Sequence, residues 1–236
     1  MDLLLIFGAL SIAKIAYFIN RLSFLAYDVI LNQRAVNPVS KKLLITGFDP
    51  FGGESVNPSW EAVKLIPDTI NGFEIIKMQI PTVFEKAANA VIDAAEELVP
   101  DVIICTGQAG GRTAITPEVI GINLREARIA DNEGNMPKNE PVIPDAPAAY
   151  FATLPVREMV AAINEAHIPA ALSYSAGAFV CNDVLYTLLH RFDGTETKVG
   201  FIHVPYIPEQ PKNGEFAMPL ETIRDGLCAA ICGIGE

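Results

Sequence analysis

A cysteine at the start of a helical pattern is the first residue that could do chemistry. Cys181 follows the small residues of segment 175–178 and precedes residues 183–190, whose pattern predicts a helix. Free backbone N–H groups and the helix dipole at that end favour the nucleophilic thiolate, and the same groups can receive an oxyanion. A buried, unreactive helical cysteine explains the position equally well, so the position alone does not decide.

A histidine could act as the base for this cysteine. His203 lies near the end of the apolar run 199–204, one helix and one strand after Cys181. A lone histidine in an apolar strand is more often a core residue. Its place at the carboxyl end of a strand, in a loop expected beside that of Cys181, favours a functional role. A cysteine and a histidine within hydrogen-bond reach form an activated nucleophile.

A carboxylate could complete the site. Glu118 follows segment 115–117 (ITP), shortly after the glycine-rich residues 107–112. A carboxylate can orient the imidazole of a catalytic histidine and stabilise its charged form. From the sequence pattern alone, however, a surface glutamate is the simpler explanation.

The other cysteines, Cys105, Cys228 and Cys232, are predicted to be structural thiols. The sequence contains no C-x-x-C pair and three histidines, which gives little support to a zinc site. Cys228 and Cys232 are four residues apart in a predicted helix, where an intramolecular disulfide has poor geometry. We therefore expect neither a metal site nor a disulfide framework.

The elements that must position these residues alternate between strands and helices. Buried strands are expected at 43–46 and 102–106, and further strands at 73–80, 120–124, 170–175 and 199–204. Helices are expected at 60–65 (with Ser59 as the cap), 84–99, 155–166, 183–190 and 219–231. This alternation predicts a mostly parallel sheet covered by helices on both faces. Sites in such sheets gather at the carboxyl ends of strands, here the loops 47–53, 107–112 and the turn before Cys181.

Composition limits the class of protein. The chain has 236 residues, of which 50% are apolar, so it can bury the core of one sizeable domain. Its net charge of −11 argues against nucleic acid as a partner, because binding phosphates requires clustered lysine and arginine.

Residues 1–40 form a separate apolar segment, interrupted by Lys14, Arg21 and Asp28 at intervals of seven residues. These charges share one face, which predicts a long amphipathic helix. A membrane-spanning helix over residues 3–19 is an alternative, although it is short for a bilayer and contains Lys14. A helix that packs between the subunits of an oligomer is a second alternative. A start codon assigned too far upstream would also produce such a prefix. We divide the chain into this apolar helical extension, 1–40, and a catalytic domain, 41–236.

Several motifs together resemble the pyroglutamyl peptidase type I (pyrrolidone-carboxylate peptidase) family. They occur in the family's order and span roughly residues 42–230. The motifs are 47–53 (GFDPFGG), 107–112 (GQAGGR), 115–118 (ITPE), 127–134 (ARIADNEG), 177–182 (GAFVCN) and 201–206 (FIHVPY).

The resemblance implies a catalytic triad of Glu118, Cys181 and His203 in a three-layer α/β/α sandwich without a cofactor or metal. It also implies a cytoplasmic location and a homotetramer. The residues expected to bind the pyroglutamyl ring are Phe48, Phe51, Asn57, Gln108, Ile129, Phe179 and Val180. Arg128 matches a family arginine near the nucleophile, where it would assist the oxyanion or position the substrate.

The sequence thus predicts a cysteine exopeptidase that removes N-terminal pyroglutamate from peptides through a thioester. One alternative is a related thiol amidase acting on another small cyclic acyl group. Another is a non-catalytic binding module on the same scaffold. Residues 1–40 leave open a contact with the membrane, in which case the positive residues Arg21, Arg34, Lys41 and Lys42 would keep the catalytic domain on the cytoplasmic side.

Overall fold

The structure, a computed structural model, describes residues 41–210 and 214–235. The prediction of a helical extension over residues 1–40 concerns a segment outside these described residues. Within the described part of the chain, no helix combines the length and the apolar character needed to cross a membrane.

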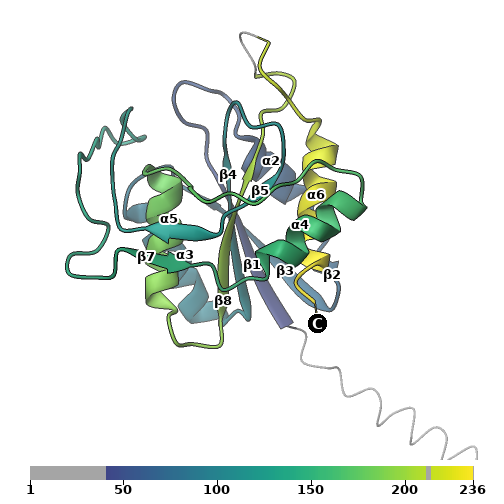
Figure 1. Ribbon diagram of the computed structural model, residues 1–236, viewed down its shortest axis with the longest axis horizontal. Coiled ribbons are helices and arrows are strands. Elements are labelled where there is room, and N and C mark those ends of the chain that lie inside the picture. Colours follow the sequence, from purple (N-terminus) through teal and green to yellow (C-terminus); the bar gives the residue numbers. More distant parts are fainter. Residues whose placement is uncertain (1–40, 211–213, 236) are drawn as a thin grey trace, which may run out of the picture. The chain divides into compact units, whose positions relative to one another are not determined.

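The described residues form a six-stranded sheet (Figure 1). In spatial order its strands are β2 (Thr69–Ile70), β3 (Phe73–Ile80), β1 (Lys41–Phe48), β4 (Val102–Gln108), β8 (Lys198–Val204) and β5 (Thr116–Pro117). The four central strands are parallel, and the short edge strands β2 and β5 are antiparallel to their neighbours. The carboxyl ends of β1, β4 and β8 therefore meet at one edge of the sheet.

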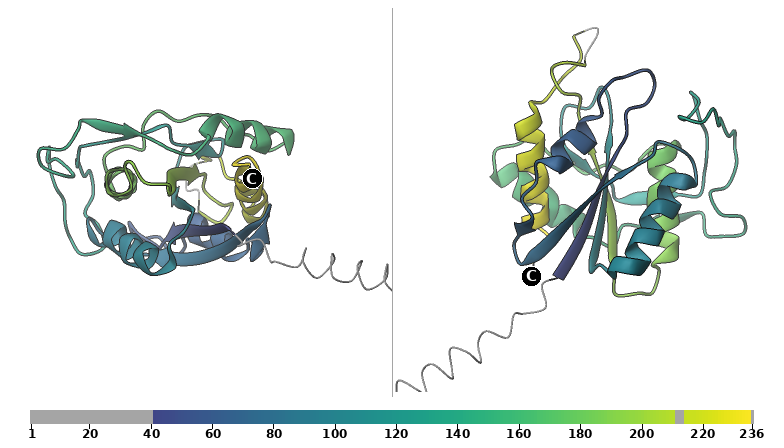
Figure 2. Two further views of the ribbon diagram at one scale, coloured as in Figure 1. Left: turned by 90° about the horizontal axis from the view of Figure 1, so that it is seen from below. Right: turned by 180° about the vertical axis from the view of Figure 1, so that it is seen from behind.

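Helices cover both faces of this sheet, as the right-hand view of Figure 2 shows. One face carries α2 (Pro58–Lys64), α4 (Val156–Glu165) and α6 (Leu220–Cys232), and the other carries α3 (Lys86–Leu98) and α5 (Val180–Arg191). The predicted three-layer α/β/α arrangement with a mostly parallel sheet is confirmed.

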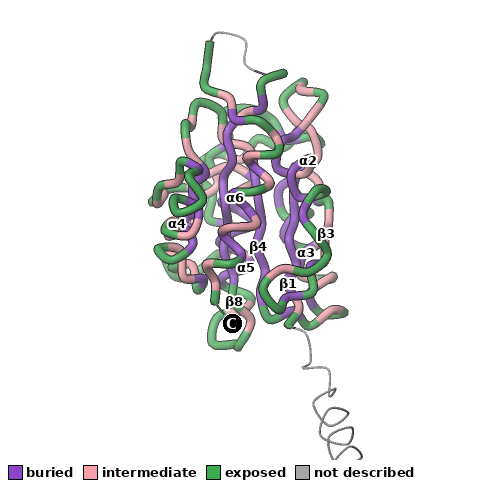
Figure 3. The backbone as a smooth tube through the Cα atoms, turned by 90° about the vertical axis from the view of Figure 1, so that its right-hand side faces the viewer, coloured by how far each residue is buried: buried purple, intermediate pink, exposed green. Residues whose placement is uncertain are grey.

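Alternation along the central strands explains the two cores. Leu43 and Ile45 of β1 pack with α2, α4 and α6, whereas Leu44 packs with α3 and α5. A strand buried on both sides needs apolar residues at nearly every position, which is why the β1 and β4 sequences read as continuous apolar runs. Figure 3 shows these strands as the buried centre of the domain.

The strand predicted at 170–175 is the main departure from the expected fold. This segment makes only isolated bridges, Ile115 with Ala170 and Glu118 with Ser173. The Ala171 N–H donates to the Ile115 carbonyl and the Ser173 N–H to the Pro117 carbonyl, as in a parallel ladder. The bond that should lie between them would come from the nitrogen of Pro117, which carries no hydrogen. The proline therefore interrupts the pairing.

The strand predicted at 120–124 is shorter and lies outside the main sheet. β6 (Ile120–Ile122) pairs with β7 (Ala149–Phe151) in a separate two-stranded sheet. Gly121 of β6 lies against α5, where an added Cβ would come within 3.1 Å of the Tyr186 backbone nitrogen. The small strand thus braces the helix that carries Cys181.

Candidate active site

A cavity of about 800 Å³ opens at the carboxyl ends of the central strands. It receives residues from the loop after β1, the glycine-rich loop after β4, the loop before α5, the end of β8 and the segment 126–129. The three loops predicted to meet are thus brought together. Cys181 and His203 both line this cavity.

Cys181 lies in the first turn of α5, one residue beyond the first helical residue Val180. The N-cap, Phe179, has no side-chain acceptor to satisfy the N–H groups of this turn. The thiol reaches the end of β4 because residue 107 is glycine. A Cβ there would lie 3.0 Å from Cys181 Sγ and 2.8 Å from Cζ of Phe201. Larger residues at position 107 would therefore displace the sulfur.

Glu118 and His203 are joined directly. β5 runs antiparallel to the end of β8, with Thr116 opposite His203, and the Glu118 N–H donates to the Phe201 carbonyl. This pairing brings the buried Glu118 carboxylate to 2.7 Å from His203 Nδ1. With Nδ1–H donating to the carboxylate, Nε2 of the ring is left as the proton acceptor.

Arg112 is a functional candidate that the sequence reasoning missed. Its Nη1 donates to Glu118 Oε1 at 2.8 Å and also to the Thr116 hydroxyl. Its Nη2 donates to the carbonyl of Ser175, in the loop before Cys181, at 3.1 Å. The only signal was its position at the end of the glycine-rich loop after a buried strand. The arginine links the Glu118 carboxylate to the loop that precedes Cys181.

The electrostatics favour a charged Glu118 and a neutral His203. Burial works to raise the pKa of Glu118, but the hydrogen bond from His203 and the positive charge of Arg112 hold that pKa below its usual value. Burial lowers the pKa of His203, and this outweighs the opposing influence of Glu118. A neutral imidazole is ready to accept a proton.

The surroundings of the Cys181 thiol do not all favour the thiolate, as the helix terminus alone would. Burial, followed by the negative charge of Glu118, raises the pKa of Cys181 to about 12. The charge of Arg112 and the residue's own backbone N–H act in the opposite direction but do not prevail. Desolvation of the half-buried sulfur thus outweighs the helix terminus. The shifts of both pKa values favour the uncharged forms, a thiol beside a neutral imidazole.

Five of the predicted substrate-binding residues line the cavity. They are Phe51, Gln108, Arg128, Ile129 and Phe179. The rings of Phe51 and Phe179 lie 6.2 Å apart, and Ile129 is 48% exposed, so these three form an open apolar wall. Such a wall suits a small, flat, uncharged group.

Three other predicted substrate-binding residues lie behind this wall. Phe48 and Val180 are buried in the core between the sheet and the α3–α5 layer. Asn57 is buried as the N-cap of α2, where its Oδ1 accepts from the Ser59 N–H and its Nδ2 donates to the Asp49 carbonyl. The N-cap of α2 is therefore Asn57, and the prediction of Ser59 as the cap was wrong. All three support the loops that form the cavity.

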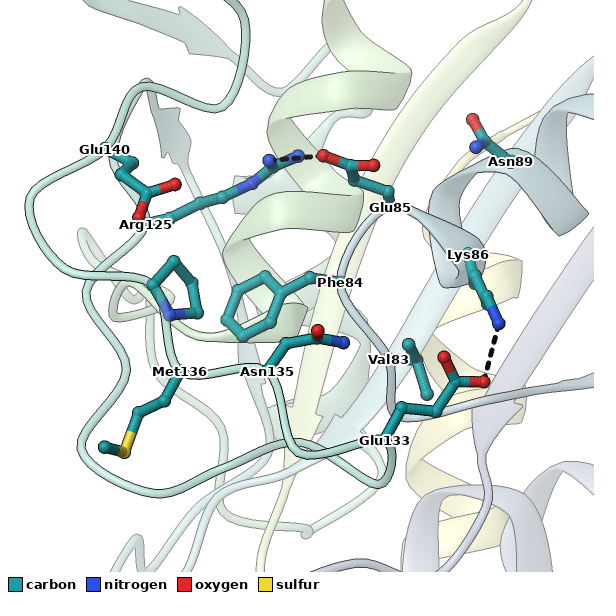
Figure 4. A pocket seen from close by; sticks show the side chains of 11 residues that line it. Val83, Phe84, Glu85, Lys86, Asn89, Arg125, Glu133, Asn135, Met136 and Glu140 are labelled. Atoms are coloured by element: carbon teal, nitrogen blue, oxygen red, sulfur yellow. Dashed lines mark hydrogen bonds and ion pairs between the residues drawn. The ribbon is translucent and has the colours of Figure 1, made fainter.

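A second cavity of about 720 Å³ is lined by residues of segments 83–89 and 133–140 and by Arg125 (Figure 4). Phe84, which lines it, packs edge-on against Phe179 at 5.3 Å, so aromatic rings separate the two cavities. Arg125 pairs there with Glu85 at 2.8 Å. No group of three or more His, Cys, Asp or Glu side chains within 41–210 and 214–235 is arranged to hold a metal ion.

Sequence comparisons with known proteins point to one family. The sequence model of the pyroglutamyl peptidase family matches residues 41–236. The pyrrolidone-carboxylate peptidase of Bacillus thuringiensis (strain Al Hakam) is 50% identical over 196 residues, which cover 81% of this chain and 91% of that protein.

Solved structures give the same result. Pyroglutamyl peptidase I from Bacillus amyloliquefaciens superposes with a TM-score of 0.81 at 48% identity, covering 83% of this chain and 95% of that chain. A mutant pyrrolidone carboxyl peptidase from the hyperthermophile Pyrococcus furiosus gives a TM-score of 0.77 at 40% identity, covering 82% and 97%. The matched residues include all six motifs and confirm the predicted class of cysteine exopeptidase, so the chain belongs to the pyroglutamyl peptidase family.

Proposed function

We propose that this chain hydrolyses the amide bond after an N-terminal pyroglutamyl residue, with Cys181 as nucleophile, His203 as general base and acid, and Glu118 as the group that orients the imidazole. The observation that carries the proposal is the 2.7 Å bond between His203 and the buried Glu118, behind a cavity that His203 shares with Cys181. The names of the relatives point to the same substrate.

Acylation begins with two neutral partners. The raised pKa of Cys181 and the lowered pKa of His203 leave both groups neutral before the reaction. The thiol proton therefore moves to Nε2 only as the sulfur attacks the substrate carbonyl. The resulting imidazolium is stabilised by the charged Glu118. The carbonyl oxygen becomes an oxyanion, for which the N–H groups of the first turn of α5 are suitable donors. Arg128, which lines the cavity, supplies a positive charge nearby.

Collapse of the tetrahedral intermediate releases the shortened peptide. His203 returns its proton to the leaving amine, and the pyroglutamyl group remains on Cys181 as a thioester. A water molecule, deprotonated by His203, then attacks the thioester carbonyl. The products are pyroglutamate and the regenerated thiol.

The cavity wall accounts for the choice of ring. The lactam is flat and uncharged, and it fits against the apolar side chains of Phe51, Phe179 and Ile129. A glutamyl or free α-amino group would lose its hydration at this wall without gaining a partner. Peptides with an open amino terminus should therefore be excluded.

Release of a chromophoric amine from pyroglutamyl and prolyl amides tests the proposal. We expect the full chain to cleave the pyroglutamyl amide and the Cys181→Ser variant to lose at least about 10³-fold in kcat. Cys228→Ser, at a half-buried thiol on α6, is the matched control and should remain active. Activity that survives in Cys181→Ser would contradict the assigned nucleophile, and preference for the prolyl amide would contradict the substrate.

We also propose a homo-oligomer, a tetramer by resemblance to the family, working in the cytoplasm. Attachment to a membrane through residues 1–40 is the alternative location. Light scattering of the full chain tests the first proposal, and separation of membrane from supernatant after cell lysis tests the second. A monomer, or recovery in the membrane fraction, would contradict them.

A further inference from the structure

A buried glutamine stands behind one wall of the active cavity. Gln210 follows β8 in the segment that also supplies His203 and Tyr206 to the cavity, and only 5% of its surface is exposed. Its amide makes hydrogen bonds on both sides, to backbone groups and to the side chain of Gln108. A polar group this deeply buried needs such partners.

The backbone fixes which way the Gln210 amide points. The Ile207 N–H donates to Gln210 Oε1 at 3.2 Å, and Gln210 Nε2 donates to the Val56 carbonyl at 3.4 Å. The reversed amide would place its NH₂ group against a backbone N–H and its oxygen against a backbone carbonyl. Both contacts would then be repulsive.

The orientation of the Gln210 amide in turn fixes the orientation of the Gln108 amide. Gln210 Nε2 donates to Gln108 Oε1 at 2.8 Å, so the oxygen of Gln108 faces Gln210, which does not line the cavity. Gln108 is the last residue of β4 and lines the cavity together with Cys181. With its oxygen held toward Gln210, the Gln108 amide presents its NH₂ group to a ligand, and this group donates hydrogen bonds and accepts none.

We propose that Gln210 is a specificity-determining residue that selects substrates with a carbonyl in the ring. It does so by holding the Gln108 amide with its NH₂ group toward the cavity. This inference rests on the proposed function, since the lactam carbonyl of pyroglutamate is the acceptor that the NH₂ group would meet. Gln210 does not touch the substrate and acts only through Gln108.

Two substitutions separate this role from simple packing. Gln210→Met keeps the length of the side chain but removes both amide groups, which frees Gln108 to rotate. Gln210→Glu keeps an acceptor for the Ile207 N–H and places a second acceptor against Gln108. Gln108 must then turn its NH₂ group toward residue 210 and present its oxygen to the cavity.

Three chromogenic amides provide the readout. One carries the pyroglutamyl group, the second a 3-oxocyclopentanecarbonyl group, in which CH₂ replaces the ring N–H, and the third a cyclopentanecarbonyl group without either polar group. The ratio of kcat/KM between the second and third amides isolates the ring carbonyl. We expect this ratio to be about 10 in the wild type, which corresponds to the contribution of one hydrogen bond in a desolvated site.

The ratio should fall to about twofold in Gln210→Met and to one or below in Gln210→Glu, mainly through KM. In a Gln108→Met background, Gln210→Met should change the ratio no further, because its effect passes through Gln108. Gln79→Met, at an exposed position of β3, is the control and should leave the ratio unchanged. The two variants at 210 differ in charge, so a folding defect in one leaves the other as a test.

Each contrary outcome has one meaning. If both Gln210 variants cleave all three amides with the wild-type ratio, or lose activity on all three equally, Gln210 has only a structural role and the inference is overturned. If the wild type cleaves none of the pyroglutamyl amide, the proposed function itself fails, and the ratio is then not at issue.

Discussion

Two buried carboxylates flank the start of α5, and they differ in what surrounds them. Glu118, behind the active cavity, receives hydrogen bonds from Arg112 and His203. Asp183, beside the second cavity, accepts from Arg125 Nε at 2.6 Å and from the Glu85 N–H at 2.9 Å. Both side chains are fully buried, yet the pKa of Glu118 is lowered and that of Asp183 is raised.

The neighbouring donors and charges explain why the two pKa values shift in opposite directions. Burial opposes charge at both sites, but at Glu118 the donors His203 and Arg112 prevail. At Asp183 burial prevails, and the negative charge of Glu85, which shares Arg125, adds to it. The first arrangement keeps a negative charge beside an imidazole. The second ties α5 to Glu85, the N-cap of α3, whose φ of 61° lies in the left-handed region. The surroundings of Glu118 suit the proposed catalysis, whereas the contacts of Asp183 hold α3 and α5 together.

The largest expected effect separates the two carboxylates by activity. Glu118→Gln should lower kcat by about 10³- to 10⁴-fold, because the amide neither fixes the histidine tautomer nor stabilises the imidazolium. Asp183→Asn should keep kcat within about tenfold, since Asp183 contacts none of the reacting groups. Steady-state kinetics on a pyroglutamyl amide measures both. Equal losses in the two variants would contradict the division of roles.

The next largest effect is on stability, where we expect Asp183→Asn to be the more damaging of the two substitutions. In Asp183→Asn one of the two donors, Arg125 Nε or the Glu85 N–H, faces an NH₂ group in place of an acceptor. We expect a loss of about 2 kcal/mol in the free energy of unfolding. Urea unfolding followed by circular dichroism measures it, with Glu97→Gln on the exposed side of α3 as the control. An unchanged free energy would mean that Asp183 does not hold α3 and α5 together.

The parts of the fold and the site that follow from local sequence patterns could be predicted, whereas those that depend on contacts between distant segments could not. Cys181 and His203 were found because the ends of parallel strands meet at one edge, a rule that needs only local patterns. Glu118 stood out only through family resemblance, since its burial depends on the antiparallel pairing of β5 with β8. Arg112 was missed for the same reason: its partners lie on β5 and in the loop before α5.

Local errors also had non-local causes. The predicted strand at 170–175 has suitable residues, but Pro117, on the neighbouring segment, withholds the hydrogen bond that would complete it. The cap of α2 was assigned to Ser59, although Asn57, two residues earlier, is the cap and also holds the Asp49 carbonyl. The sequence pattern shows the helix terminus, which favours the thiolate of Cys181, but it does not show the burial that raises the pKa of this thiol.

Arg112 and Arg125, which bind the two carboxylates, should differ in their effect on the pH dependence of kcat/KM. Arg112 lowers the pKa of His203, so Arg112→Met should raise that pKa and move the acidic limb of kcat/KM to higher pH. We expect about a tenfold loss of kcat/KM near neutral pH, from one missing bond to a charged group. Arg125→Met, beside Asp183, should destabilise the fold but leave the limb in place. A limb that moves equally in both variants would mean that Arg112 has no special influence on His203.

The smallest effect is a difference in the pH dependence of stability. The folded-state pKa of Glu118 is below the usual 4.5, so its contribution is present above pH 4.5 and is lost as the pH falls through the folded value. The folded-state pKa of Asp183 is above the usual 3.8, so its contribution is greatest below pH 3.8 and declines as the pH rises toward the folded value.

Urea unfolding of the wild type, Glu118→Gln and Asp183→Asn between about pH 3 and 6 measures this difference. The stability advantage of the wild type over Glu118→Gln should grow with pH, while its advantage over Asp183→Asn should shrink. Slopes of the same sign would mean that the two carboxylates share one electrostatic environment. Opposite slopes would mean that one of two fully buried carboxylates is held in the charged form that catalysis requires, while the other carries its charge at a cost to stability.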